Sequence, residues 1–154
     1  MPYAGRTIVA AIIAGAATTA VALFSAYRLA DAPIRGRLGG PDPIGSVASL
    51  VAFVIALVAF WRLGRSIASD ATTSRPAIAA GALGGALAGF IAGIAQSFAL
   101  SDYLGAVLAG YAVPPEFLAL ALRAYVVLAT IGASVIAAAV TYAGWYRSRA
   151  APPA

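Results

Sequence analysis

The chain has 154 residues, of which 62% are hydrophobic and 10% are charged, and its formal net charge is +5 at pH 7. About a quarter of the residues in a soluble globular domain are charged, so this composition excludes an ordinary soluble protein. The sequence contains neither cysteine nor histidine, which excludes disulfides, cysteine metal sites and histidine general bases.

Four apolar stretches follow one another along the chain, and each is long enough to cross a bilayer as a helix. A helix needs about 20 residues to cross a hydrocarbon core of roughly 30 Å, and backbone groups in lipid must be hydrogen-bonded within their own segment. The sequence therefore predicts an all-α fold, an integral membrane four-helix bundle that forms a single domain over residues 1–146. The predicted spans cover residues 8–27, 44–63, 77–100 and 117–145.

The segments outside these spans differ in composition. Residues 28–43 are rich in glycine, proline and charge, which predicts an exposed loop. Residues 101–116 are mostly apolar but too short to span a membrane, so we expect them to lie in the interface, to re-enter the bilayer slightly or to cover a partner subunit. Residues 147–154 are expected to form a disordered tail.

The distribution of arginine predicts the orientation, because every basic residue in the chain is an arginine. If the spans alternate in direction, three arginines fall on the side opposite the termini, and Arg123 lies just inside the fourth span. Positively charged residues favour the cytoplasmic side, so both termini are expected in the cytoplasm. The arginines on the side of the termini are Arg6, Arg62, Arg65, Arg75, Arg147 and Arg149.

The expected surroundings follow from the same residues. The arginines lie at span ends, where topology and contacts with anionic lipid head groups explain them, so nucleic acid is not an expected partner. The expected partners are the lipid bilayer and other membrane protein subunits or further copies of the chain, and no cofactor is expected. The arginine-rich and alanine-rich composition is typical of a GC-rich bacterial genome, which favours the inner (plasma) membrane.

The third span carries a glycine at every fourth position: Gly81, Gly85, Gly89 and Gly93. Residues four apart share one helix face, and small residues allow helices in lipid to approach closely, so the four glycines predict a helix-packing surface. The surface can pack against another span of the same chain, a second copy or a different subunit. Small residues recur at the same spacing in the other spans, including residues 129–141, where the abundance of alanine explains them.

A few polar side chains lie near the end of the third span and the start of the fourth span: Gln96, Asp102, Glu116 and Arg123. A charge inside a membrane is costly, so Arg123 is expected to extend its side chain toward the surface, past Glu116, or to pair with Asp102. We interpret the four residues as an interfacial polar cluster in which a salt bridge holds the two spans together. An anion or substrate site is the alternative.

The sequence contains no phosphate-binding loop, dinucleotide fingerprint or nucleophile elbow, and an enzyme is not expected. The scarcity of polar residues within the spans favours a small non-catalytic accessory or structural subunit that packs within a larger membrane protein complex. The alternative is an oligomeric small-solute transporter or channel component, with a pathway that is gated near Arg123.

Overall fold

The computed structural model describes residues 3–30 and 43–150, and within these ranges every regular element is an α-helix. Each of the four helices contains a stretch that is long and apolar enough to cross a membrane. The all-helical architecture and the four candidate spans are therefore confirmed. The helices are α1 (Ala4–Ala30), α2 (Pro43–Ala68), α3 (Arg75–Gly110) and α4 (Glu116–Ala150).

All four helices extend beyond their predicted spans, and α3 does so the furthest. Helix α3 continues through Gly110, so most of the segment that was expected to be a separate interfacial connection is helical. After Pro76 in its first turn, α3 meets no proline until Pro114, so no proline stops the helix earlier. Helix α4 continues through Ala150, which corrects the expectation of a disordered tail for residues 147–150. The exposed loop was expected over residues 28–43, but residues 28–30 belong to α1 and Pro43 begins α2. Residues 31–42 and 151–154 lie outside the described residues.

Helix α3 ends in a turn in which Ala112 adopts the left-handed conformation, with φ of 54°. The N–H of Val113 donates to the Leu108 carbonyl at 3.0 Å, and the N–H of Ala112 donates to the Ala109 carbonyl at 3.1 Å. This pair of hydrogen bonds is the Schellman motif, which satisfies carbonyl groups that a helix end leaves without partners. Pro114 follows directly and prevents the helix from continuing.

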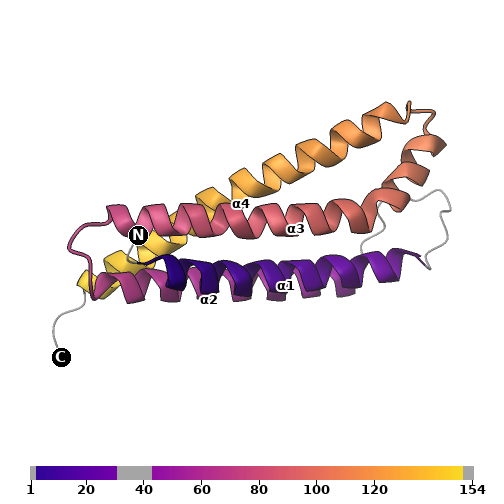
Figure 1. The fold of residues 1–154 in the computed structure, drawn as a ribbon. Helices are drawn as coiled ribbons and strands as arrows, with labels where there is room; N and C mark the ends of the chain where they lie inside the picture. The colour runs from indigo at the N-terminus through magenta and orange to yellow at the C-terminus, as the bar shows by residue number, and fades with distance from the viewer. Residues whose placement is uncertain (1–2, 31–42, 151–154) are drawn as a thin grey trace.

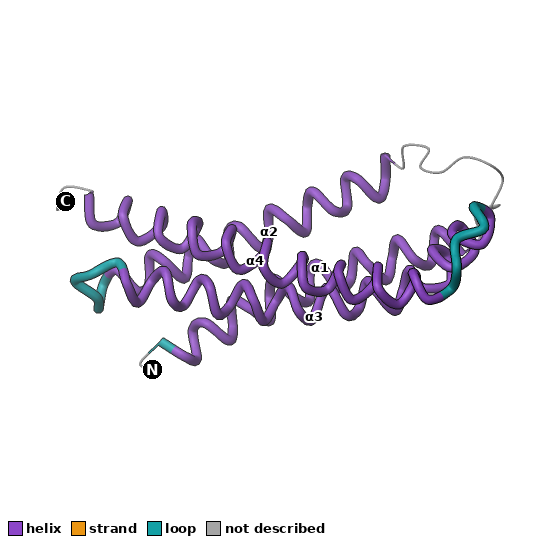
Figure 2. The backbone as a smooth tube through the Cα atoms, turned by 90° about the horizontal axis from the view of Figure 1, so that it is seen from above, coloured by secondary structure: helices purple, strands orange, loops and turns teal. Residues whose placement is uncertain are grey.

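The helices form an elongated bundle whose order around the axis is α1, α2, α4, α3 (Figure 1). The most extensive contact joins α3 and α4, the consecutive helices α2 and α3 touch only slightly, and no contact joins α1 and α4 in the described part of the chain. Figure 2 shows α2 and α4 crossing and then parting along the bundle. The beginning of α1, the α2–α3 turn and the end of α4 meet at one end, which we call the terminal end.

The interior and the surface of the bundle are built from side chains of different size. Most of the buried apolar residues are alanines, and Ile67 is the largest apolar side chain that is fully buried. Large aliphatic side chains point outward on every helix, as at Val47, Leu83 and Leu128. Water-soluble proteins instead place such side chains in the core. The outer surface therefore suits a lipid or protein environment rather than water.

Candidate functional site

The four glycines of α3 lie against α4. A Cβ at Gly81 would lie 2.6 Å from the Ala137 carbonyl oxygen, and a Cβ at Gly89 would lie 2.5 Å from the Ala129 carbonyl oxygen. Real Cβ atoms essentially never approach another atom within 3.0 Å, so no side chain fits at these positions without a shift of the helices. Among the partners that the sequence left open for these glycines, the structure places another helix of the same chain against them.

The surface of α4 that meets the glycines is a second row of small residues. The contacting positions are Ala129, Ala133, Ala137 and Thr141. The abundance of alanine was sufficient to explain this row in the sequence, so its role in packing was not predicted. The signal was present, because the same fourfold spacing of small residues occurs in two consecutive antiparallel spans. Hydrogen bonds also cross the contact between α3 and α4, from the Ser134 hydroxyl to the Ala82 carbonyl at 3.0 Å and from the Ser97 hydroxyl to the Leu122 carbonyl at 3.4 Å.

A second close approach joins α2 and α4 near the terminal end. A Cβ at Gly144 would lie 2.5 Å from the Trp61 carbonyl oxygen, and a Cβ at Gly64 would overlap the Thr141 carbonyl oxygen. Neither glycine was predicted to mark a contact, because each stands alone in the sequence rather than in a repeat. From this crossing α2 and α4 diverge toward the other end of the bundle (Figures 1 and 2).

A cavity of about 340 Å³ lies where α2 and α4 have parted, at the middle of the bundle, and all four helices line it. Glycine and alanine contribute much of the wall, while Phe53, Leu57 and Phe60 line it from α2. Thr18 and Gln96 are the polar residues in the lining. The Thr18 hydroxyl lies 2.9 Å from the Ala14 carbonyl of its own helix, so it has a local acceptor. The cavity is therefore an apolar space with one amide, that of Gln96, which has no hydrogen-bond partner in the described part of the chain.

The structure does not assemble the predicted polar cluster. Gln96 faces the cavity, whereas Asp102, Glu116 and Arg123 are exposed, and no hydrogen bond or ion pair joins any of the four within the described part of the chain. The helical phase of α4 explains this result. The Leu122 carbonyl accepts a hydrogen bond from α3, so the next residue, Arg123, lies about 100° around the helix from that contact.

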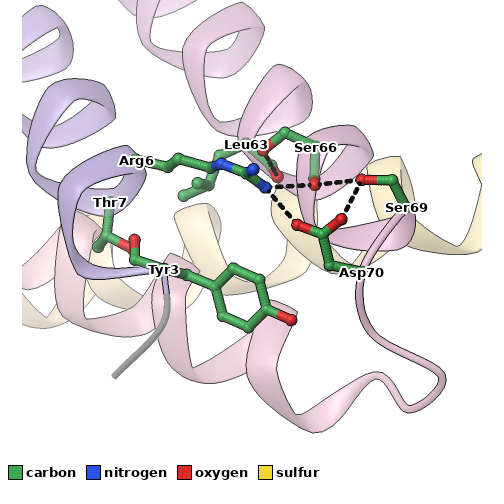
Figure 3. Close-up of polar contacts among 7 residues, drawn as sticks. All are labelled: Tyr3, Arg6, Thr7, Leu63, Ser66, Ser69 and Asp70. Atoms are coloured by element: carbon green, nitrogen blue, oxygen red, sulfur yellow. Dashed lines mark hydrogen bonds and ion pairs between the residues drawn. The ribbon is translucent and has the colours of Figure 1, made fainter.

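Polar contacts gather instead at the terminal end, where Arg6 of α1 reaches the end of α2 (Figure 3). One guanidinium nitrogen donates to Asp70 and to the Ser66 carbonyl, in both cases at 2.8 Å. The Ser69 hydroxyl donates to the other oxygen of Asp70 at 2.9 Å. The Ser69 hydrogen bond, and then the Arg6 contact, lower the pKa of the Asp70 carboxyl. The Ser69 hydroxyl also lies 2.9 Å from the Ser66 carbonyl, so Arg6 and Ser69 are both donors to this oxygen in the last turn of α2.

Helix α4 holds the same α2–α3 turn from the other side. The Trp145 indole N–H donates to the Ala71 carbonyl at 3.2 Å, and the Arg149 guanidinium donates to the same oxygen at 2.6 Å. From the sequence, Arg6 and Arg149 were expected only to set the orientation, and no role was predicted for Asp70. The available signal was that Asp70 is the single acidic residue on a side that carries six arginines.

These polar contacts join α1 and α4 to the end of α2 and the turn that follows it. In residues 3–30 and 43–150 no group of three potential ligands could hold a metal ion. Comparisons of the chain with protein-family models, with curated proteins and with solved structures find no match.

Proposed function

We propose that this chain is a multi-pass membrane protein of the inner (plasma) membrane and serves as a small non-catalytic accessory subunit of a larger membrane protein complex. The observation that carries the proposal is the reversed arrangement of side-chain size, with glycine and alanine inside and large aliphatic residues outside. Small residues let helices associate where the hydrophobic effect contributes little, and the outer surface is left to apolar neighbours.

The gap between α2 and α4 is the proposed contact with the partner, which would be an apolar transmembrane helix of another subunit. The cavity extends into this gap, and a Cβ at Gly132 on its α4 wall would meet no atom within 4 Å. Helices pack with axes about 8–10 Å apart, with side chains of one in the grooves of the other. Side chains of a partner helix that lies along the gap would fill the cavity.

Site-specific photo-crosslinking in the native membrane tests this contact. A crosslinking residue at Leu128, which lines the cavity on α4, is expected to yield a discrete adduct with another membrane protein. Leu83 is the matched control, because it is also an exposed leucine but lines a groove between α1 and α3. Equal protein adducts at both positions, or adducts only with lipid, would contradict the proposed contact. Co-purification in mild detergent would then identify the crosslinked subunit.

The proposed orientation places the terminal end in the cytoplasm. Arg6, Arg65 and Arg149 are among six arginines on that side, which the positive-inside rule favours. Reporter fusions at Ala154 and at Gly39 test it. A cytoplasmic signal at Ala154 and an external signal at Gly39 are expected, and the reverse pattern would show the opposite orientation.

A transporter or channel component is the second candidate, and the amide of Gln96 at the apolar cavity is the observation that favours it. An amide can both donate and accept hydrogen bonds, which suits a neutral polar solute. Proteoliposome uptake of radiolabelled sugars and amino acids tests this function. Uptake that Gln96→Leu abolishes without lowering the thermal midpoint would favour the transporter, and no uptake by the native protein would count against it.

A further inference from the structure

A basic hollow of about 560 Å³ lies at the terminal end, between the last turns of α2 and α4. Arg62 and Arg65 are three residues apart, so they share one face of α2. Both are exposed, and neither has a hydrogen bond or ion pair with any residue in the part of the chain that the structure describes. The lining residues are Arg62, Arg65, Ser66, Ala68, Ser69 and Ser148.

The negative groups nearest to the hollow are already paired. The carboxylate of Asp70 accepts hydrogen bonds from Arg6 and Ser69, and the Ser66 carbonyl accepts another from Arg6. The last carbonyls of a helix carry partial negative charge that would repel an anion, and the Arg6 guanidinium offsets it here. The positive charge of Arg62 and Arg65 is therefore left to face the hollow.

Aromatic side chains place the hollow near the level of lipid head groups. On α4, just before Ser148, the Tyr142 ring lies 6.3 Å from the Trp145 ring and 6.1 Å from the Tyr146 ring, measured between centroids. Tyrosine and tryptophan concentrate at membrane–water interfaces. One and two turns before Arg62, the same face of α2 carries the exposed apolar side chains of Val58 and Ile55. An acyl chain below a bound head group would lie along these residues.

We infer that this hollow binds the phosphate group of an anionic membrane lipid of the phosphatidylglycerol type. The planar guanidinium groups of Arg62 and Arg65 can each donate two parallel hydrogen bonds to phosphate oxygens. In the structure the Ser148 hydroxyl donates to the Gly144 carbonyl of its own helix at 3.0 Å. A hydroxyl group can rotate, so Ser148 can donate to a bound phosphate instead. The apolar face of α2 below the arginines favours a lipid over free phosphate as the source of this group.

Native mass spectrometry of the full chain, released from detergent, tests the site by titration with phosphatidylglycerol, phosphatidylcholine and inorganic phosphate. We expect phosphatidylglycerol to bind more tightly than phosphatidylcholine. The double variant Arg62→Gln/Arg65→Gln is expected to lower its affinity by about tenfold or more. The matched control is Arg75→Gln/Arg147→Gln, which removes the same charge at the same end but lies outside the hollow, and its loss is expected to be about twofold or less.

Three results would overturn the inference. Equal losses in the two double variants would mean that diffuse surface charge attracts the lipid. Equal binding of phosphatidylglycerol and phosphatidylcholine would mean that the hollow does not select an anionic head group. Displacement of phosphatidylglycerol by an equal concentration of inorganic phosphate would identify free phosphate, not lipid, as the ligand.

A second variant covers the case in which Arg62→Gln/Arg65→Gln lowers the thermal midpoint below the temperature of the titration. Arg62→Lys/Arg65→Lys keeps both charges but cannot make the paired hydrogen bonds of a guanidinium group. Its affinity for phosphatidylglycerol is expected to fall by about threefold. An unchanged affinity in the lysine variant would overturn the bidentate phosphate contact.

Discussion

Gly85 of α3 lies so close to Ala133 of α4 that a Cβ at position 85 would overlap the Ala133 carbonyl oxygen. Gly85→Ala is therefore expected to push the two helices apart and to destabilise the protein by about 2 kcal/mol, as overpacking of a core does. Gly132→Ala is the control, since a Cβ there meets no atom within 4 Å, and alanine is the better helix former by about 1 kcal/mol. Thermal unfolding in detergent measures both, and equal midpoints would contradict the close contact.

The two ends of the glycine row differ in how much space they leave. A Cβ at Gly93 would lie 3.2 Å from the Val126 Cα, which a small shift can relieve, whereas a Cβ at Gly81 would lie 2.6 Å from the Ala137 carbonyl oxygen. Gly81→Ala is expected to lower the midpoint of thermal unfolding as much as Gly85→Ala does, and Gly93→Ala is expected to lower it less. A larger loss at Gly93 than at Gly81 would show that the helices are closest at the other end.

Two hydroxyl groups of α4 are expected to respond differently to removal. The Ser134 hydroxyl donates across the interface to the Ala82 carbonyl at 3.0 Å. Ser134→Ala is therefore expected to cost about 0.6 kcal/mol, the average for hydrogen bonds between membrane helices, and at most about 1.7 kcal/mol. The Thr141 hydroxyl is buried and has no hydrogen-bond partner among residues 3–30 and 43–150, and a buried unsatisfied polar group is destabilising. Thr141→Val is therefore expected to be neutral or stabilising in the same unfolding measurement. A larger loss for Thr141→Val than for Ser134→Ala would contradict these assignments.

The contact between Arg6 and Asp70 predicts a pH dependence of stability. The pKa of Asp70 in the folded protein is lower than its ordinary value of 3.8, first because Ser69 and then because Arg6 hydrogen-bonds the carboxylate. The resulting stabilisation is present above pH 3.8 and is lost as the pH falls through the lower pKa of the folded state. In a series of unfolding midpoints measured from neutral to strongly acidic pH, Asp70→Asn is expected to remove this part of the acid response. An unchanged acid response in Asp70→Asn would mean that other carboxyl groups cause it.

The turn after α3 offers a stabilising substitution. Ala112 has φ of 54°, a conformation that costs an L-residue about 1–2 kcal/mol and that glycine adopts freely. Ala112→Gly is therefore expected to stabilise the protein by about 1 kcal/mol. Ala109→Gly, within the last turn of the helix, is the control and is expected to destabilise it by about 1 kcal/mol. A lower unfolding midpoint for Ala112→Gly would mean that the turn does not need the left-handed conformation.

Features that depend on a single segment were predictable from the sequence. Four apolar stretches predicted four helices, because length and hydropathy are local properties that the rest of the fold does not alter. The spacing of Gly81, Gly85, Gly89 and Gly93 likewise defined one helix face before any partner was known. The end of α3 was predicted too early because an apolar helix can continue beyond the length that a bilayer requires, and no proline lies between Pro76, in the first turn of α3, and Pro114.

Features that depend on two or more segments were decided only by the tertiary structure. Small residues repeat on several helices, so the sequence left open that Gly85 would meet Ala133, and isolated glycines such as Gly64 gave no sign of a crossing. The expected pairing of Arg123 with Asp102 required Arg123 to lie on the face of α4 that packs against α3, and it does not. Asp70 instead pairs with Arg6, on a helix distant in the chain. In lipid the hydrophobic effect hardly distinguishes one apolar face from another, so the helix order depends on how closely the backbones can approach.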